Sequence, residues 1–348
     1  KNNIQKQASL CYKKQNMRRK NSSVTRLRDA NIYPKVKSVL IKYKKNNSFV
    51  VGVSGGPDSL ALSALANTIA EEKKYKFFFV MVDHGIRKNS GKEALQVKKL
   101  LSKHGINLEI LRNRKKITNN IQRKARDVRY QLLESFCKKK KAKSLLVGHH
   151  QDDQIETFLI RLSRGSGVEG LSSMQEMTTL KSGISLIRPL LEFKKTQLTS
   201  IAKKTFGKIF KDPSNKNKKF LRTNIRTLKR NLINKGIDLE KIIRSIKNIA
   251  STKEAIDFYV AKSMKKFVKF EKKSTILNLT QFRKEPQEIK FRIINNIVKK
   301  RSDSYYPPRS KKVLNLISGF QNNNLIKCTL GGCIFERKKS FLHVSKEF

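Results

Sequence analysis

The residues best suited to ligand binding or catalysis lie in the stretch SGGPDS, residues 54–59, which separates two apolar runs. Gly55 and Gly56 have no side chains, so a backbone at these positions can approach an anion closely. Pro57 suits the first turn of a helix, and the amino end of a helix attracts phosphate. This order of residues predicts a phosphate-binding loop that leads into a helix.

The polar side chains of the same stretch fit a phosphate group together with a metal ion. Ser54 and Ser59 carry hydroxyl groups that can donate hydrogen bonds to phosphate oxygens. Asp58 has no proton to donate to phosphate, so a magnesium ion is its natural partner. We therefore expect Mg²⁺ at this loop, with Asp58 as the candidate metal ligand.

Two other interpretations of the loop stay open from its residues alone. Residues 52–56 match the nucleophile elbow G-x-S-x-G of esterases, although a pattern with two free positions matches easily. A plain Gly-Pro turn would explain the glycines but not the serines and Asp58. The loop is not a Walker A loop, because no Gly-Lys-Ser/Thr follows it.

A second polar cluster is HHQDDQIET, residues 149–157. Asp153 and Glu156 are three residues apart on a predicted helix, so both carboxylates share one face and suit a pocket for a cationic ligand. The alternative is an acidic helix start favoured by the helix dipole. No Cys or His lies at a sequence spacing from His149 and His150 that is typical of zinc ligands, so we expect one of them to act as a general base or phosphate contact and the other to pack.

The elements that must position these clusters alternate between strand and helix. We predict strands over 48–53, 77–82, 107–111 and 144–148, and helices over 59–72, 91–103, 121–139 and 152–163. This alternation predicts an α/β fold with a doubly wound parallel sheet, whose ligands bind at the carboxyl ends of the strands. Later in the chain we predict helices over 238–270 and 289–300 and a β-hairpin over 325–345.

Three of the predicted strands end in a dense polar cluster. The clusters are residues 54–59, DHGIR at 83–87, and residues 149–157. Because the carboxyl ends of parallel strands lie at one edge of a sheet, we expect the three clusters to form one site. Asp83 and Arg87 join the candidate residues on this ground.

The charge balance points to a polyanionic partner. The 348 residues include 79 Lys and Arg against 26 Asp and Glu, which gives a net charge of +53. An AT-rich genome favours lysine codons, but it does not deplete acidic residues, so we expect RNA or DNA held through phosphate contacts. A membrane surface is the weaker alternative, and no apolar run approaches the roughly 20 residues that span a bilayer.

The cysteines and the first residues bear on location. Four scattered cysteines, at positions 11, 137, 328 and 333, are typical of a reducing compartment, and we expect Cys328 and Cys333 to be apolar strand residues. We expect a cytoplasmic protein. The basic stretch before Asp29 is typical of an RNA-binding arm or of an organelle-import peptide.

The motifs together resemble the tRNA(Ile)-lysidine synthetase family of the ATP-pyrophosphatase (PP-loop) superfamily. The loop alone indicates the superfamily, and the later motifs make the resemblance specific. The matching stretches are SGGPDS (54–59), VDHGIR (82–87), IQRKARDVRY (121–130), GHHQDDQIET (148–157), RGSGVEGL (164–171), RPLL (188–191), DPSN (212–215) and RTNIR (222–226).

The resemblance implies a fold and a domain plan. The fold is adenine nucleotide alpha hydrolase-like, with a smaller C-terminal helical and α+β domain. We predict a basic arm over 1–30, a catalytic domain over 31–230, and a helical linker with a tRNA-binding domain over 231–348. Some family members carry a further C-terminal domain, which we do not expect in this protein.

The resemblance also implies an activity. Family members use ATP to adenylate the C2 oxygen of the wobble cytidine of an isoleucine tRNA with a CAU anticodon, and lysine then displaces AMP. The implied partners are that tRNA and free L-lysine, with ATP and Mg²⁺ as cofactors, no membrane, and a homodimer as one permitted assembly.

The resemblance assigns roles to three groups of residues. The ATP site comprises Ser54, Gly55, Gly56, Pro57, Asp58, Ser59, Asp83 and Arg87. The catalytic and lysine-binding residues are His149, Asp153 and Glu156. The tRNA or phosphate contacts are Arg126, Arg129, Arg164, Arg222 and Arg226.

Two rival classes use some of the same features. A tRNA thiolase would share SGGPDS but needs cysteines to handle sulfur, and only Cys137 lies within the motif-bearing region. A non-catalytic RNA-binding module would need the basic surface but would leave the three polar strand ends unexplained.

Overall fold

The computed structural model describes residues 31–86, 89–113, 121–210, 221–302, 308–321 and 326–347. The chain divides into two compact units, the first extending to Ile246 and the second beginning at Lys247. Each unit has its own hydrophobic core. The division of the chain into functional domains that we made from the sequence stays a prediction.

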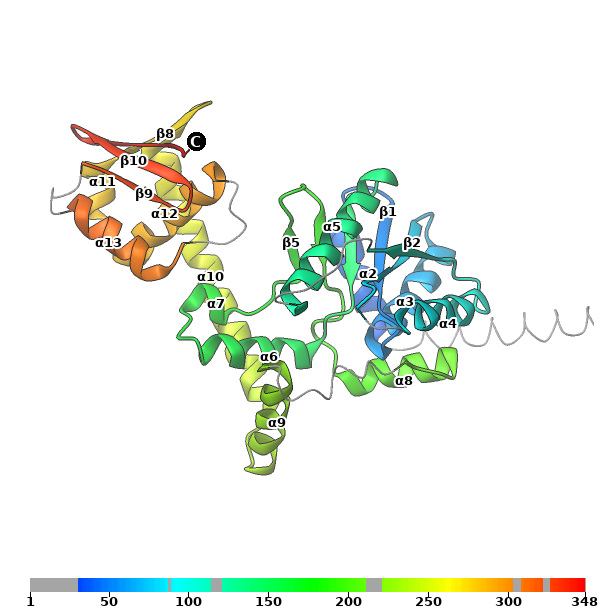
Figure 1. Cartoon of the computed structure of the whole chain (residues 1–348). Helices are drawn as coiled ribbons and strands as arrows, with labels where there is room; N and C mark the ends of the chain where they lie inside the picture. The colour runs from blue at the N-terminus through cyan, green and yellow to red at the C-terminus, as the bar shows by residue number, and fades with distance from the viewer. Residues whose placement is uncertain are drawn as a thin grey trace, which may run out of the picture. The chain divides into compact units, whose positions relative to one another are not determined.

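The first unit is built on a six-stranded sheet in the order β3-β2-β1-β4-β6-β5 (Figure 1). All neighbouring pairs are parallel except β5 and β6, which run antiparallel. The strands are β1 (Ser48–Val53), β2 (Lys76–Asp83), β3 (Leu108–Arg112), β4 (Ser144–Val147), β5 (Met177–Thr179) and β6 (Ser185–Ile187).

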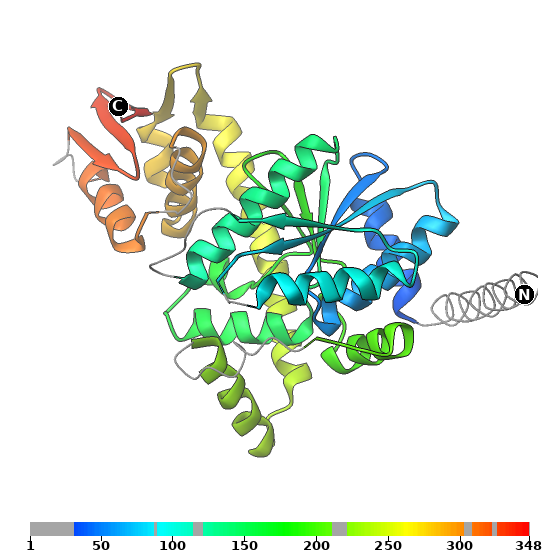
Figure 2. The ribbon, with the colours of Figure 1, turned by 45° about the vertical axis from the view of Figure 1, so that its right-hand side comes forward.

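Helices cover both faces of this sheet (Figure 1 and Figure 2). They are α2 (Ile32–Tyr43), α3 (Pro57–Glu72), α4 (Ser90–Ser102), α5 (Ile121–Lys139), α6 (Gln151–Leu162), α7 (Val168–Leu171), α8 (Lys195–Phe206) and α9 (Leu221–Asn234). Phe49 and Val51 of β1 pack with α2, α3 and α8 on one face, while Val50 packs with α5 on the other. The central strands are therefore continuous apolar runs, which explains why they were evident from the sequence.

The predicted α/β fold with a doubly wound sheet is confirmed, and the eight predicted elements of the first unit lie within two residues of their observed bounds. The sequence did not reveal α2, α7, β5, β6, α8 or α9. The two strands are only three residues long, which is too short to show a period, and α9 follows a strongly basic segment. The DPSN stretch at 212–215 lies outside the described residues.

The second unit packs helices against one face of an antiparallel sheet in the order β7-β8-β11-β10-β9. Helix α10 (Leu239–Phe267) leads into it from the first unit. The remaining elements are β7 (Val268–Phe270), β8 (Ser274–Asn278), α11 (Leu279–Lys284), α12 (Gln287–Arg301), α13 (Ser310–Gln321), β9 (Lys327–Leu330), β10 (Cys333–Lys338) and β11 (Phe341–Lys346).

The predicted hairpin over 325–345 is a three-stranded meander. Gly331 and Gly332 both have positive φ angles, 61° and 77°, and form an additional turn between β9 and β10. A side chain at either position would be strained. Cys328 and Cys333 lie in these strands, as expected.

Gly148 sets the separation between the loops that follow β1 and β4. A methyl group at this position would lie 3.1 Å from the backbone carbonyl carbon and oxygen of Asp58 and 3.2 Å from the backbone nitrogen of Ser59. Such distances are tighter than most carbon contacts, so the backbone at Asp58 and Ser59 would have to shift by a few tenths of an ångström. Glycine at position 148 therefore lets the polar cluster after β4 lie close to the phosphate-loop stretch without such a shift.

We expect Gly148→Ala to lower the free energy of unfolding by about 1–3 kcal/mol, the usual cost of overpacking. Gly91→Ala is the matched control, because its new methyl group would meet only the Asp83 side chain, at an ordinary contact distance of 3.5 Å. Urea unfolding of both variants tests this expectation. Equal stability of the two variants would show that the approach of the loops does not depend on Gly148.

Candidate active site

The strand order reverses at the carboxyl ends of β1 and β4. The chain proceeds from β1 to β2 and β3 on one side of the sheet and then returns to β4 on the other side. Open α/β sheets bind their ligands outside the carboxyl ends of the strands at such a reversal. The loops after β1 and β4 are SGGPDS and the start of HHQDDQIET, so the reversal joins two of the three polar clusters found in the sequence.

Hydrogen bonds within the SGGPDS stretch fix its shape. Gly55 has a φ of +78°, and its carbonyl accepts from the backbone nitrogen of Phe210 at 3.2 Å. The Ser59 hydroxyl accepts from the backbone nitrogen of Ser54 at 3.0 Å and donates to the Gly56 carbonyl at 3.1 Å. Ser59 is buried and closes the loop, whereas Ser54 is exposed, so we expect the two serines to play different parts.

Asp58, His150 and Asp153 form a connected group at this reversal of the strand order. Nε2 of His150 lies 3.5 Å from Oδ2 of Asp58 and 3.5 Å from Oδ2 of Asp153. Because Asp58 comes from α3 and Asp153 from α6, the imidazole joins the two loops. From the sequence we assigned Asp58 and Asp153 to separate tasks, and no pattern of residues indicated that His150 lies between them.

His150 also begins helix α6. Its Nδ1 accepts from the backbone nitrogen of Asp152 at 3.2 Å, and its own backbone nitrogen donates to Oδ2 of Asp153 at 3.2 Å. This reciprocal capping satisfies two amide groups at the helix start. Burial lowers the pKa of His150, but the hydrogen bond with Asp58 and the charges of the three nearby aspartates outweigh burial and leave the pKa raised.

Asp58 retains one oxygen that could hold a cation. Oδ1 of Asp58 is buried and has no hydrogen-bond partner among the described residues. An unsatisfied buried carboxylate oxygen beside a phosphate-loop stretch suits Mg²⁺, which usually takes one or two carboxylates together with substrate phosphates. The described residues contain no group of three or more His, Cys, Asp or Glu side chains that could hold a metal ion.

The neighbouring His149 has the opposite electrostatic environment. Burial and the positive charges of four arginines hold the pKa of His149 well below 6.5, and its Nδ1 is buried without a hydrogen-bond partner among the described residues. The four arginines, in order of decreasing effect, are Arg188, Arg126, Arg129 and Arg222. His149 is therefore a neutral imidazole within a cationic group of side chains.

Arg188 is a member of this cationic group that sequence analysis did not assign. It is 7% exposed and donates to the Gln175 carbonyl at 2.8 Å and to Oγ1 of Thr178 at 3.0 Å. Its signals were a charged residue inside the apolar stretch SLIRPLL and its place in the family-like motif RPLL (188–191). A buried arginine in such a run requires polar partners, and here backbone and hydroxyl groups supply them.

Helices α6 and α9 are joined by two ion pairs. Oε1 of Glu156 accepts from Nε of Arg226 at 2.8 Å, and Lys229 pairs with Asp152. Glu156 is only 3% exposed, and its Oε2 has no hydrogen-bond partner among the described residues. Arg226, cited from the sequence as a tRNA contact, lies against this carboxylate.

The other cited residues are more dispersed. Asp83 accepts from the backbone nitrogen of Gly85 at 3.0 Å and shapes the loop after β2. Arg129 lies beside Gly52 of β1, while the side chains of Arg126, Arg164 and Arg222 are exposed. Arg87 lies outside the described residues. Their roles stay predictions.

One observation bears on the rival thiolase class, and another on whether a described helix could span a membrane. The thiol of Cys137 is buried on α5, and burial raises its pKa to about 12, so it is poorly suited to sulfur chemistry. Among the described helices, none is both long enough and apolar enough to cross a membrane.

Comparison with known proteins gives the class. A family model described as a PP-loop domain matches residues 29–233. A solved structure of a U34-tRNA thiolase from Methanococcus maripaludis, with its 4Fe–4S cluster, superposes with a TM-score of 0.53 at 20% identity, covering 63% of this chain and 78% of that one. The sheet order, the loop and the family match define an ATP-utilising PP-loop enzyme.

The particular family follows from closer relatives. A tRNA(Ile)-lysidine synthase of Wolbachia pipientis wMel is 36% identical over 293 residues, covering 83% of this chain and 68% of the relative. Another from Rickettsia typhi is 32% identical over 311 residues, covering 87% and 70% respectively. The chain belongs to the tRNA(Ile)-lysidine synthase family, which confirms the resemblance seen in its motifs.

The depressed pKa of His149 predicts a pH effect on stability. A histidine whose pKa is lower in the folded state stabilises that state above the unfolded pKa near 6.5, and this contribution is lost as the pH falls. We expect the wild-type protein to lose more unfolding free energy than His149→Gln between about pH 7.5 and pH 5.5, which bracket that value. The raised pKa of His150 has the opposite effect but is present in both proteins. Urea unfolding at the two pH values measures the difference, and equal losses would contradict a neutral, half-buried His149.

Proposed function

We propose that the protein ligates lysine to C2 of the wobble cytidine of the isoleucine tRNA with a CAU anticodon, through an adenylated tRNA, and releases AMP and pyrophosphate. The observation that carries the proposal is the contact of His150 with both Asp58 and Asp153. This contact supports one shared site for the predicted ATP loop and the carboxylates of α6, as two consecutive half-reactions on one base require. Family membership supplies the substrate class.

The first half-reaction activates a poor leaving group. The C2 oxygen of cytidine attacks the α-phosphorus of ATP, a new oxygen–phosphorus bond forms, and pyrophosphate departs. We assign the pyrophosphate to the amino end of α3 and the SGGPDS loop, where backbone amides and the Ser54 hydroxyl face an anion favourably. Mg²⁺, when bound at Asp58, would neutralise phosphate charge on the departing pyrophosphate.

The second half-reaction needs a lysine bound by its backbone groups. In our proposal Glu156, through its unpartnered Oε2, and Asp153 accept from the α-ammonium group of lysine. Arg226 beside Glu156 offers a positive charge to the α-carboxylate, so the ion pair matches the two charges of a free amino acid. The lysine side chain then extends toward the adenylated base.

The attacking ε-amine must lose a proton. His149 is neutral because of its burial and the surrounding arginines, so it can accept that proton. The nitrogen bonds to C2, the C2–oxygen bond breaks, and AMP leaves with the oxygen. We assign the phosphates of the tRNA and of AMP to the arginines around His149, together with Arg164.

The direct test is to incubate the purified protein with isoleucine tRNA, ATP and labelled lysine. We expect label in the tRNA that depends on ATP, with one AMP formed for each lysine. Label that appears without ATP, or in tRNA whose wobble base is not cytidine, would contradict the proposal.

Asp58→Ala should reduce AMP formation at least about 100-fold, the order of loss when a positioned electrostatic group is removed. Binding of tRNA should be nearly unchanged, because the loop serves ATP and the basic surfaces serve RNA. Glu72→Gln is the control, since Glu72 pairs with Lys37 at the far end of α3. A parallel loss of AMP formation and tRNA binding in Asp58→Ala would mean that the loop is structural.

Glu156→Gln should weaken lysine use by about 1.5–3 kcal/mol, the range for hydrogen bonds to charged groups. Glutamine keeps an acceptor for Arg226 but removes the charge that attracts an ammonium group. Adenylation of the tRNA should change much less. Measuring the two half-reactions separately, with Glu72→Gln as control, decides the matter. Failed adenylation with unchanged lysine dependence would place Glu156 in the ATP site.

A further inference from the structure

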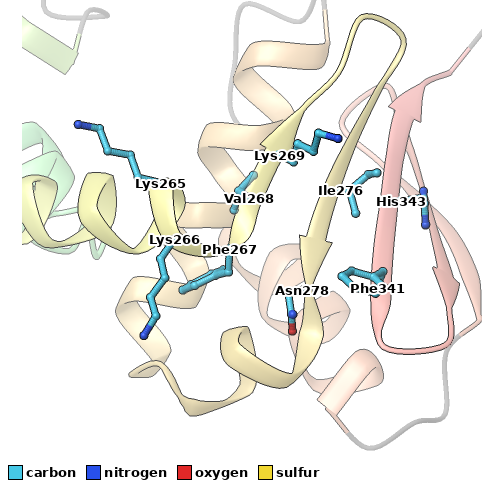
Figure 3. A pocket seen from close by; sticks show the side chains of 9 residues that line it. All are labelled: Lys265, Lys266, Phe267, Val268, Lys269, Ile276, Asn278, Phe341 and His343. Carbon is cyan, nitrogen blue, oxygen red and sulfur yellow. The ribbon is translucent and has the colours of Figure 1, made fainter.

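The second unit contains a groove on the outer face of its sheet (Figure 3). It has a volume of about 530 Å³, within the range of about 300–1,000 Å³ typical of small-molecule sites. The end of α10 and strands β7, β8 and β11 form its walls. The residues that line it are Lys265, Lys266, Phe267, Val268, Lys269, Ile276, Asn278, Phe341 and His343.

Strand alternation explains why these side chains are available. Leu277, Leu342 and Val344 point into the core of the unit, so the intervening residues of β8 and β11 point away from it. On this outer face Phe341 is paired with Asn278, and His343 with Ile276. The groove thus offers two apolar side chains next to an amide and an imidazole.

Phe341 is the most informative residue of the groove. It is 43% exposed, although it lies within a strand of a well-packed sheet. A phenylalanine on the outer face of a sheet contributes nothing to the core beneath it. Exposed aromatic rings on sheets are the surfaces on which proteins stack unpaired bases.

The rim of the groove is cationic. Lys265 and Lys266 are exposed and pair with no carboxylate among the described residues. Lys269 pairs with Glu271 at 3.3 Å, but both side chains are exposed, Lys269 largely so, and the pair is weak enough to exchange for another anion. Glu336, opposite His343 on β10, already pairs with Lys338 at 3.1 Å.

We propose that this groove binds an unpaired nucleotide of single-stranded RNA. The base stacks on Phe341 beside Ile276, and Asn278 and His343 contact its edge or its sugar. Lys265 and Lys266 contact the flanking phosphates. The choice of RNA rests on the proposed function, whereas the geometry requires only a flat aromatic group flanked by negative charges. A membrane surface fits less well, because membrane-binding faces expose a longer apolar stripe.

The test uses the full chain without ATP or lysine, so it does not depend on ligation. The probe is a short fluorescein-labelled single-stranded RNA, with fluorescence anisotropy as the measurement. We expect Phe341→Ala to weaken binding about 5- to 150-fold, the range equivalent to the loss of one stacked base. Phe258→Ala is the matched control, because Phe258 is 74% exposed on α10 and lies outside the groove.

Two further variants separate stacking from other causes. Phe341→Leu keeps apolar area but removes the aromatic face, so it should bind nearly as weakly as Phe341→Ala. Replacing Lys265 and Lys266 with glutamine should make the slope of log affinity against log salt concentration shallower by about 0.7 for each phosphate that is no longer neutralised. Replacing Lys311 and Lys312, an exposed pair on α13, should not change this slope. Urea unfolding confirms that each variant is folded.

Several outcomes would overturn the inference. Equal RNA affinity of Phe341→Ala and Phe258→Ala would do so, as would ultraviolet crosslinks to RNA that avoid the peptide containing Phe341 and His343. Loss of binding to anionic phospholipid vesicles in Phe341→Ala, with RNA binding unchanged, would assign the groove to membranes instead. If the wild-type protein makes lysidine but Phe341→Ala binds RNA with normal affinity, the RNA-binding role of the groove is refuted and the proposed function is not. RNA binding at the groove without lysidine formation would refute the proposed function alone.

Discussion

The site depends on the close approach of two loops that are far apart in the sequence. Gly148 leaves room for the backbone of Asp58 and Ser59, and His150 then reaches both Asp58 and Asp153. Without this approach, the amino ends of α3 and α6 would be two separate anion-attracting positions. With it, the proposed phosphate-binding loop and the proposed cation-binding carboxylates lie side by side, as the proposed reaction between ATP and an amine requires.

The protein controls charge locally in spite of its large overall excess of positive charge. Two adjacent histidines illustrate this control. His150 lies among three aspartates that raise its pKa, while His149 lies among four arginines that, together with burial, lower its pKa. One imidazole can therefore stabilise carboxylates while its neighbour stays neutral and able to accept a proton. Neighbouring groups with opposed pKa shifts are typical of active sites.

The two units present different kinds of side chain. In the first unit, buried Glu156 and half-buried aspartates lie with His150 near the ends of parallel strands. In the second unit, the outer face of an antiparallel sheet presents an aromatic ring and lysines. The first arrangement suits chemistry on small groups, and the second suits recognition of a polyanion, which needs surface more than burial.

The sequence by itself determined the fold class, the phosphate-loop stretch and the family. Central strands buried on both faces are continuous apolar runs, which can be recognised in the sequence. The loop needs glycine, proline and aspartate in a fixed order, and that order is also visible in the sequence. It also predicted that polar strand ends would gather at one edge. Only the tertiary structure decided that Glu156 pairs with Arg226, that Arg188 lies near His149, and that His150 rather than His149 joins the two loops. These facts depend on which side chains from distant elements come within a few ångströms of one another, and no local pattern of residues encodes such distances.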